Sequence, residues 1–143
     1  MRFEFNDGGR SGAGYQGKTG DCTCRAIAIA AKLPYAYVYM LLNESAKEQR
    51  ITKRQPKRGS ARTGIYRTTI RQIMEMFGWT WTPTMQIGSG CKVHLRDGEL
   101  PMGRLIVSVS KHMVAVVDGV IQDTHDPSRH GTRCVYGFYQ KRI

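Results

Sequence analysis

The sequence predicts a single α+β domain in which helices come first and antiparallel strands follow. A chain of 143 residues with 41% apolar side chains is long enough to bury its own hydrophobic core. The run that starts at Asp21 is rich in alanine and isoleucine and has no helix breaker before Pro34. The last third of the chain alternates apolar and polar residues around Asp118–Gly119, which is typical of a two-residue hairpin turn.

The first third of the chain is predicted to contain a loop and two helices. Residues 1–20 form a glycine-rich loop region that opens with a short strand end, where phenylalanines alternate with polar residues. Residues 21–48 hold two helices. Asp21 is expected to cap the first of them, and Pro34 suits the first turn of the second. Alanine and isoleucine leave the first helix few polar positions, which predicts a helix buried on most sides.

The rest of the chain is predicted to hold a basic loop, a third helix and the strands. Residues 49–67 carry seven Lys or Arg and no acid, with proline and glycine between them, which is typical of a surface loop. Residues 68–78 form a helix that ends at Gly78. Residues 79–143 are mainly antiparallel strands, with no element assigned to the turn-rich stretch 84–104. The strands expected are WTWTP (79–83), RLIVSVS (104–110), the hairpin HMVAVVDGVIQDTHD (112–126) and RCVYGFYQ (133–140).

Composition and charge limit the partners and the location. The 22 Lys and Arg against 11 Asp and Glu give a formal net charge of +11, which favours an anionic partner such as nucleic acid or an acidic protein. No run approaches the roughly 20 apolar residues of a membrane span, and the N-terminus lacks the apolar centre of a signal peptide. We therefore expect a cytoplasmic location and no membrane partner. In that compartment the four cysteines are expected to be thiols or metal ligands rather than disulfides.

Cys22 is the candidate nucleophile. It lies at the start of the first predicted helix, where unpaired backbone N–H groups and the helix dipole favour a thiolate. The glycine-rich loop before it gives a substrate backbone access to the sulfur. Such a thiol still needs a base and a group that stabilises the oxyanion. Gln16 lies six residues upstream of Cys22.

Two blocks of the sequence resemble the papain-like cysteine peptidases. QGKTGDCTCRAIAIA (16–30) is similar to their signature of a glutamine, five residues, and a cysteine that opens a buried alanine-rich helix. SKHMVAVVDGVIQDTHD (110–126) resembles their hairpin, in which a histidine opens an apolar strand and an Asn or Asp on the returning strand holds its ring. The resemblance implies that Cys22 is the nucleophile, that Gln16 and the Cys22 N–H hold the oxyanion, and that His112 is the base. It implies no cofactor and no metal.

Hairpin geometry selects the third member of the triad. With Asp118–Gly119 as the turn, His112 faces His125, and Asp123 lies diagonal to His112 on the same face. Asp123 is therefore favoured as the residue that orients the ring. Asp126 falls on the opposite face unless the strand has ended, but with the proline after it Asp126 resembles the Asp–Pro pair of bacteriocin-processing peptidases of the same clan, so it stays open as the alternative. His125 also stays open, as the base itself or in the place where papain-like enzymes carry a tryptophan.

Two further readings compete for these residues. Cys22 and Cys24 with Cys91 and His94 give four soft ligands in two pairs, as in a zinc site, although two sulfurs at a one-residue gap diverge on a helix. The basic loop forms a possible binding patch for nucleic acid through phosphate contacts, or for an acidic protein substrate that it steers towards the thiol. The residues of this patch are Arg50, Lys53, Arg54, Lys57, Arg58 and Arg62.

The expected function is therefore that of a cysteine peptidase-like hydrolase. A minimal papain-like fold, with the N-terminal helices packed on a twisted antiparallel sheet, would cleave a peptide, isopeptide or amide bond of a protein or peptide substrate. Deamidation or transamidation needs the same residues. The alternative is a non-enzymatic protein that binds nucleic acid or another partner on an inactive papain-like scaffold. The segments GIYRTTIRQIMEMFGWTWTPT and IGSGCKVHL resemble small proteins of phages and bacteria, which implies a phage or prophage source and, for a phage protein, the host cytoplasm.

Overall fold

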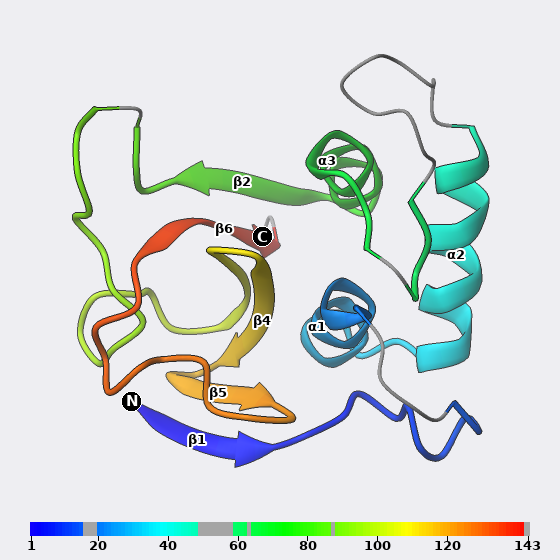
Figure 1. The fold of residues 1–143 in the computed structure, drawn as a ribbon, viewed down its shortest axis with the longest axis horizontal. Helices are drawn as coiled ribbons and strands as arrows, with labels where there is room; N and C mark the ends of the chain where they lie inside the picture. The colour runs from blue at the N-terminus through cyan, green and yellow to red at the C-terminus, as the bar shows by residue number, and fades with distance from the viewer. Residues whose placement is uncertain (16–19, 49–58, 63, 87, 142–143) are drawn as a thin grey trace.

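The structure, a computed structural model, describes every residue except 16–19, 49–58, 63, 87 and 142–143. Over the described residues the chain forms three helices and one six-stranded sheet (Figure 1). The elements in chain order are β1 (Arg2–Phe5), α1 (Cys22–Ala31), α2 (Tyr35–Lys47), α3 (Arg67–Met76), β2 (Trp79–Pro83), β3 (Arg104–Val109), β4 (His112–Val117), β5 (Val120–Asp123) and β6 (Val135–Lys141). The predicted α+β class is confirmed. None of these helices is long and apolar enough to cross a lipid bilayer.

The sheet is mixed rather than antiparallel throughout. Its strand order is β1-β5-β4-β3-β6-β2, and four of the five neighbouring pairs are antiparallel. The exception is β1, which runs parallel to β5 with Arg2 opposite Val120 and Phe5 opposite Asp123. The expectation of an antiparallel sheet is wrong at this edge. Most of the chain separates β1 from β5, so no hairpin turn sets their relative direction.

The β4–β5 hairpin has the predicted register. Val117 pairs with Val120 across Asp118–Gly119, and both turn residues have positive φ angles, 49° and 78°, as a type I′ turn requires. The ladder continues as far as the pair Ala115 and Gln122. Because β4 begins at His112 and β5 ends at Asp123, these two residues lie at the open end of the hairpin.

Two apolar cores lie on opposite faces of the curved sheet. On one face α1 packs against β4 and β3, while α2 and α3 form an outer layer (Figure 1). The other face is covered by the segment between β2 and β3, with the fully buried Leu95 among its side chains. Side chains alternate along each strand, so Ile106 points to the helices and Val107 to the second core. With apolar contacts on both sides, the sheet and α1 form a fixed frame for the residues at their ends.

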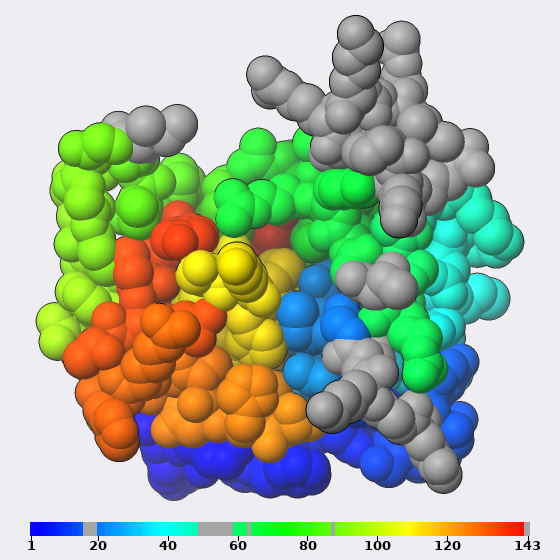
Figure 2. Space-filling model, viewed as in Figure 1, coloured from blue at the N-terminus to red at the C-terminus, as the bar shows by residue number. Residues whose placement is uncertain are grey.

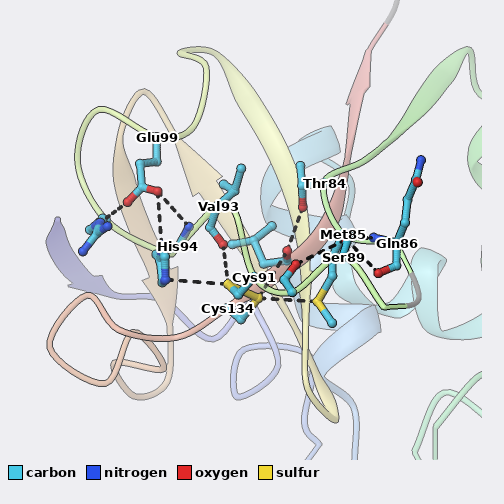
Figure 3. Close-up of a disulfide and its surroundings, with 12 residues drawn as sticks. Thr84, Met85, Gln86, Ser89, Cys91, Val93, His94, Glu99 and Cys134 are labelled. Atoms are coloured by element: carbon cyan, nitrogen blue, oxygen red, sulfur yellow. Dashed lines mark hydrogen bonds and ion pairs between the residues drawn. A yellow bond between two sulfur atoms is a disulfide. The ribbon is translucent and has the colours of Figure 1, made fainter.

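A disulfide joins the segment after β2 to the start of β6 (Figure 3). The Cα atoms of Cys91 and Cys134 are 5.9 Å apart, a usual separation for bridged cysteines. An isolated β-bridge between His94 and Cys134 brings the two segments together. The expectation that all four cysteines are thiols or metal ligands is wrong for this pair, because contacts between distant segments are not visible in local spacing. Cys22 and Cys24 are free thiols.

Candidate active site

Cys22 is the first residue of α1 and is not fully buried, like Ala31 at the other end of the helix. The helix is buried from Thr23 to Ala30, as its alanine and isoleucine content predicts, whereas Cys22 is partly exposed. On the face shown in Figure 2 the start of α1 (blue), the turn between β3 and β4 (yellow) and the segment after β5 (orange) meet at the surface. Because Cys22 begins α1, its sulfur lies at a helix N-terminus, where the helix dipole favours a negative charge.

His112 and Asp123 come from the two strands of the hairpin and are in contact. Nε2 of His112 lies 2.6 Å from Oδ2 of Asp123. Asp123 is only 3% exposed, and its Oδ1 accepts a hydrogen bond from the backbone N–H of Thr124 at 2.7 Å. A buried carboxylate on one ring nitrogen fixes the orientation of the imidazole and leaves Nδ1 for another partner.

Cys22 interacts with the same side chain: a hydrogen bond between Cys22 and His112 contributes to the pKa of each group. Burial acts to raise the pKa of Cys22, but the hydrogen bond to His112, the His112 charge, the Met113 N–H and the charge of Arg25 outweigh it, so the pKa is lowered. Cys22 and His112 also line one groove of about 290 Å³ together with Gly20, Gly64 and Lys111. The thiol therefore faces a space that a substrate can enter.

The charges of the three residues support one another. Burial acts to lower the pKa of His112, but the hydrogen bonds to Asp123 and Cys22 outweigh it and raise the pKa to about 9. Burial acts to raise the pKa of Asp123, yet the hydrogen bond and charge of His112 lower it below its ordinary value. At neutral pH these directions favour a thiolate, an imidazolium and a carboxylate.

Sequence reasoning missed a buried network behind the triad. Arg25 donates from Nη1 to Asp21 at 2.6 Å and from Nη2 to Asp123 at 3.3 Å, and the Tyr35 hydroxyl donates to the other oxygen of Asp21 at 2.6 Å. Asp21 occupies the helix N-cap position as predicted, but its side chain makes no capping hydrogen bond because both oxygens are used in this network. The sequence does contain a signal for this network: Arg25 is the one charged residue in the alanine- and isoleucine-rich helix, and it lies four residues after Asp21.

Asp126, His125 and Cys24 lie near the three site residues but differ from them in contacts or burial. Asp126 is exposed in the loop after β5 and accepts the backbone N–H of Ser128 at 2.9 Å, so Asp123, not Asp126, contacts His112. His125 is exposed, and its ring centroid lies 5.2 Å from that of His112, which agrees with the predicted register. Cys24 is buried, and burial together with the charge of Asp21 raises its pKa to about 12.

The remaining predicted residues fall outside the described part of the chain or apart from the site. Gln16 lies outside it, as do Arg50, Lys53, Arg54, Lys57 and Arg58 of the basic patch. Arg62 is described and exposed, and its backbone C=O accepts the Gly20 N–H at 2.7 Å. Within the described part of residues 49–67, Gly64, Ile65 and Arg67 line the groove.

The structure also bears on metal ligands. Cys91 is bonded to Cys134, which removes it from the four-ligand zinc reading. Within the described ranges the one cluster with metal-ligand geometry is His112, Asp123 and His125, whose ligand atoms lie within 4.8 Å of one another. The 2.6 Å between His112 and Asp123 is a hydrogen-bond distance, shorter than the roughly 3.3 Å between two ligands of one tetrahedral zinc ion. This geometry favours a shared proton over a shared metal.

The chemistry of the site is that of an activated thiol. It holds a nucleophile, a base in contact with it and a carboxylate that orients the base, which is the arrangement of covalent acyl transfer. A scan against protein-family models, a search of curated proteins and a search of solved structures found no match to this chain. The interpretation therefore depends on the geometry of Cys22, His112 and Asp123.

Proposed function

We propose that this chain is a cysteine hydrolase of papain-like type that cleaves a peptide, isopeptide or amide bond. One observation carries the proposal: a partly exposed thiol at a helix N-terminus lines one groove with His112, whose Nε2 lies 2.6 Å from the buried carboxylate of Asp123. If His112 and Asp123 only stabilised the fold, there would be no reason for a thiol with a lowered pKa to lie beside them in an open groove. The order of the residues along the chain also agrees with the resemblance to papain-like peptidases.

The proposed reaction proceeds through a thioester. The Cys22 thiolate attacks the carbonyl carbon, and the negative charge that develops on the oxygen is stabilised by the Cys22 N–H and by the predicted donor Gln16. The His112 imidazolium gives its proton to the leaving amine as the C–N bond breaks. His112 then takes a proton from water, which attacks the thioester and releases the acid and Cys22. If an amine replaces water the product is a transamidated chain, and if the substrate is a side-chain amide the reaction is deamidation.

The proposal includes a substrate and a location. The substrate is a protein or peptide, and the net charge of +11 favours an acidic one. The location is the cytoplasm, or the host cytoplasm for a phage-encoded chain. Nucleic-acid binding stays the alternative prediction.

Digestion of a peptide library tests the proposal. Peptides from a denatured bacterial proteome are incubated with the protein, and new termini, deamidated residues and thioester adducts are identified by mass spectrometry. We expect turnover that is lost in Cys22→Ala and reduced at least about a hundredfold in His112→Ala. Cys24→Ala is the matched control, because Cys24 is a neighbouring buried cysteine with a raised pKa. Absence of any product, together with slow alkylation of Cys22 by iodoacetamide below neutral pH, would contradict the proposal.

A further inference from the structure

A second pocket lies beside the groove of Cys22. It has a volume of about 270 Å³ and is lined by residues of α3, β2 and β6. Arg67, Ile70, Ser108 and Met113 line both this pocket and the groove, so the two cavities are adjacent. Its volume is below the roughly 300–1,000 Å³ of pockets that hold a whole small ligand. The pocket is instead of a size for one side chain of a longer substrate whose backbone passes Cys22.

Aromatic rings form one wall of this pocket. Trp81 on β2 stacks against Tyr139 on β6 with ring centroids 4.8 Å apart. Gly137 on β6 makes room for this, because a Cβ atom at that position would lie 2.3 Å from the Trp81 ring. The indole therefore lies directly on the backbone of β6. It gives the pocket a flat apolar surface.

Two arginines form the opposite side. Arg67 and Arg71 are one turn apart on α3, with their guanidinium carbons 5.8 Å from the ring centroids of Tyr136 and Trp81, respectively. Neither arginine has an ion pair with a carboxylate in the part of the chain that the structure describes. Contact with a ring face holds a guanidinium in place, and Arg71 also forms a side-chain hydrogen bond with Tyr139. Each guanidinium has five N–H groups, so donors remain for a ligand. Glu75, the next charged residue along α3, does not line the pocket.

We infer that this pocket binds the carboxylate side chain of a glutamate that lies close to the scissile bond of a peptide substrate. The inference rests on the proposed function, because it assigns a specificity to the same site. The apolar stem of glutamate packs on the Trp81 ring, and its carboxylate accepts charge-assisted hydrogen bonds from Arg67 and Arg71. Glutamine has the same shape but lacks the charge, and lysine would place a third cation beside the two arginines.

Alkylating peptides test the pocket without requiring turnover. One series carries a chloromethyl ketone at its C-terminus and the other an iodoacetyl group at its N-terminus, so the variable residue reaches either side of Cys22. In both series the thiolate displaces the halide and forms a thioether. The variable residue is Glu, Gln or Lys, and each rate is divided by the rate for iodoacetamide, which has no side chain to place. In one series we expect Glu to label Cys22 about tenfold faster than Gln.

Variants assign this preference to the pocket. Arg71→Ala, and independently Arg67→Ala, should bring the Glu to Gln ratio close to one. Arg2→Ala removes the same charge from the exposed face of β1, at the other edge of the sheet, and should keep the ratio. Equal rates for Glu and Gln in both series would overturn the inference. Protection of Cys22 from alkylation by a single-stranded oligonucleotide, with no preference for the Glu peptides, would also overturn it. Slow labelling by iodoacetamide itself would instead count against the proposed function.

Discussion

Arg25 on α1 lies 3.3 Å from Asp123 on β5 and thereby ties the helix of the nucleophile to the carboxylate that holds the base. The same guanidinium lies 2.6 Å from Asp21, the residue before Cys22. All three charged groups are buried, so Arg25 helps to fix the positions of Cys22 and His112 relative to each other. Arg10, 3.7 Å from Asp21, is a further cation beside this network. We therefore regard Arg25 as a positioning residue.

Arg25→Met should destabilise the protein and raise the pKa of Cys22. Removing one partner of a buried ion pair costs about 3–5 kcal/mol of unfolding free energy. The lower end of that range is expected here, because Arg10 still faces Asp21 and His112 still faces Asp123. The positive charge of Arg25 also contributes to lowering the Cys22 pKa, so the midpoint of the pH profile of iodoacetamide labelling should move to higher pH. Urea unfolding measures the first effect and the labelling profile measures the second.

Arg104→Met is the matched control for this substitution. Arg104 donates to the carbonyl oxygens of Ile29 and Ala30 at the other end of α1, at 2.6 Å each. Its loss should reduce stability without moving the Cys22 labelling midpoint. If both variants shift the midpoint equally, the effect of Arg25 is general loosening of α1. Arg25→Lys keeps the positive charge but not the forked guanidinium. Compared with Arg25→Met, it should bring the Cys22 labelling midpoint part of the way back towards the wild-type value and recover little of the lost stability.

Between neutral and mildly basic pH the contributions of Cys22 and His112 to stability should oppose each other. His112, with its pKa raised from 6.5 to about 9, contributes stability that is complete below pH 6.5 and is lost as the pH rises to about 9. Cys22, with its pKa lowered from 9.0, contributes stability that is present above pH 9.0 and is lost as the pH falls through its folded pKa. Between these limits the two contributions change in opposite directions.

Cys22→Ser should therefore make the pH dependence of stability that His112 contributes measurable, because the opposing contribution of the thiol is removed. Above pH 6.5 the histidine of the unfolded chain has released its proton, whereas folded His112 keeps its proton because of Asp123. The free energy of unfolding therefore falls as the pH rises. The slope approaches about 1.4 kcal/mol per pH unit at most. Urea unfolding at a series of pH values measures it. The double variant Cys22→Ser/His112→Gln should be flat. A flat single variant would contradict the claim that Asp123 by itself raises the pKa of His112.

The parts of the fold that were predicted depend on local pattern. The Asp118–Gly119 turn and the alternating residues around it specify the register that places His112 near Asp123. The alanine and isoleucine run specifies a buried helix that starts at Cys22. Both features involve neighbours in sequence, so residue spacing is enough to infer them.

The parts that were not predicted depend on contacts between distant segments. The parallel pairing of β1 with β5 and the Cys91–Cys134 disulfide join segments that no local signal connects. The same holds for the second half of the Arg25 network, since the contact with Asp123 spans 98 positions. The Asp21–Arg25 pair at i,i+4 spacing was visible, but only tertiary burial turns it into part of the site.

Reduction of the Cys91–Cys134 disulfide should destabilise the protein. The bridged cysteines are 43 positions apart, and closing a loop of that length in the unfolded chain is worth about 4 kcal/mol in the chain-entropy model. Dithiothreitol should therefore lower the free energy of unfolding by about 2–4 kcal/mol in urea titrations. The double variant Cys91→Ser/Cys134→Ser should not respond to dithiothreitol. A wild-type protein that is equally insensitive would show that the bridge does not form.

Gly137→Ala should disturb the wall of the second pocket. The φ angle of Gly137 is not positive, so the backbone accepts alanine, but the new Cβ would lie 2.3 Å from the Trp81 ring and 2.8 Å from the Thr82 carbonyl oxygen. Forcing the ring away costs about 1–3 kcal/mol of stability and should change the fluorescence of Trp81. Gly12→Ala is the matched control, because its nearest neighbour would be the Gly9 carbonyl oxygen at an ordinary 3.6 Å. If Gly137→Ala is as neutral as Gly12→Ala, the indole does not lie on the backbone of β6, and the apolar surface assigned to the pocket is lost.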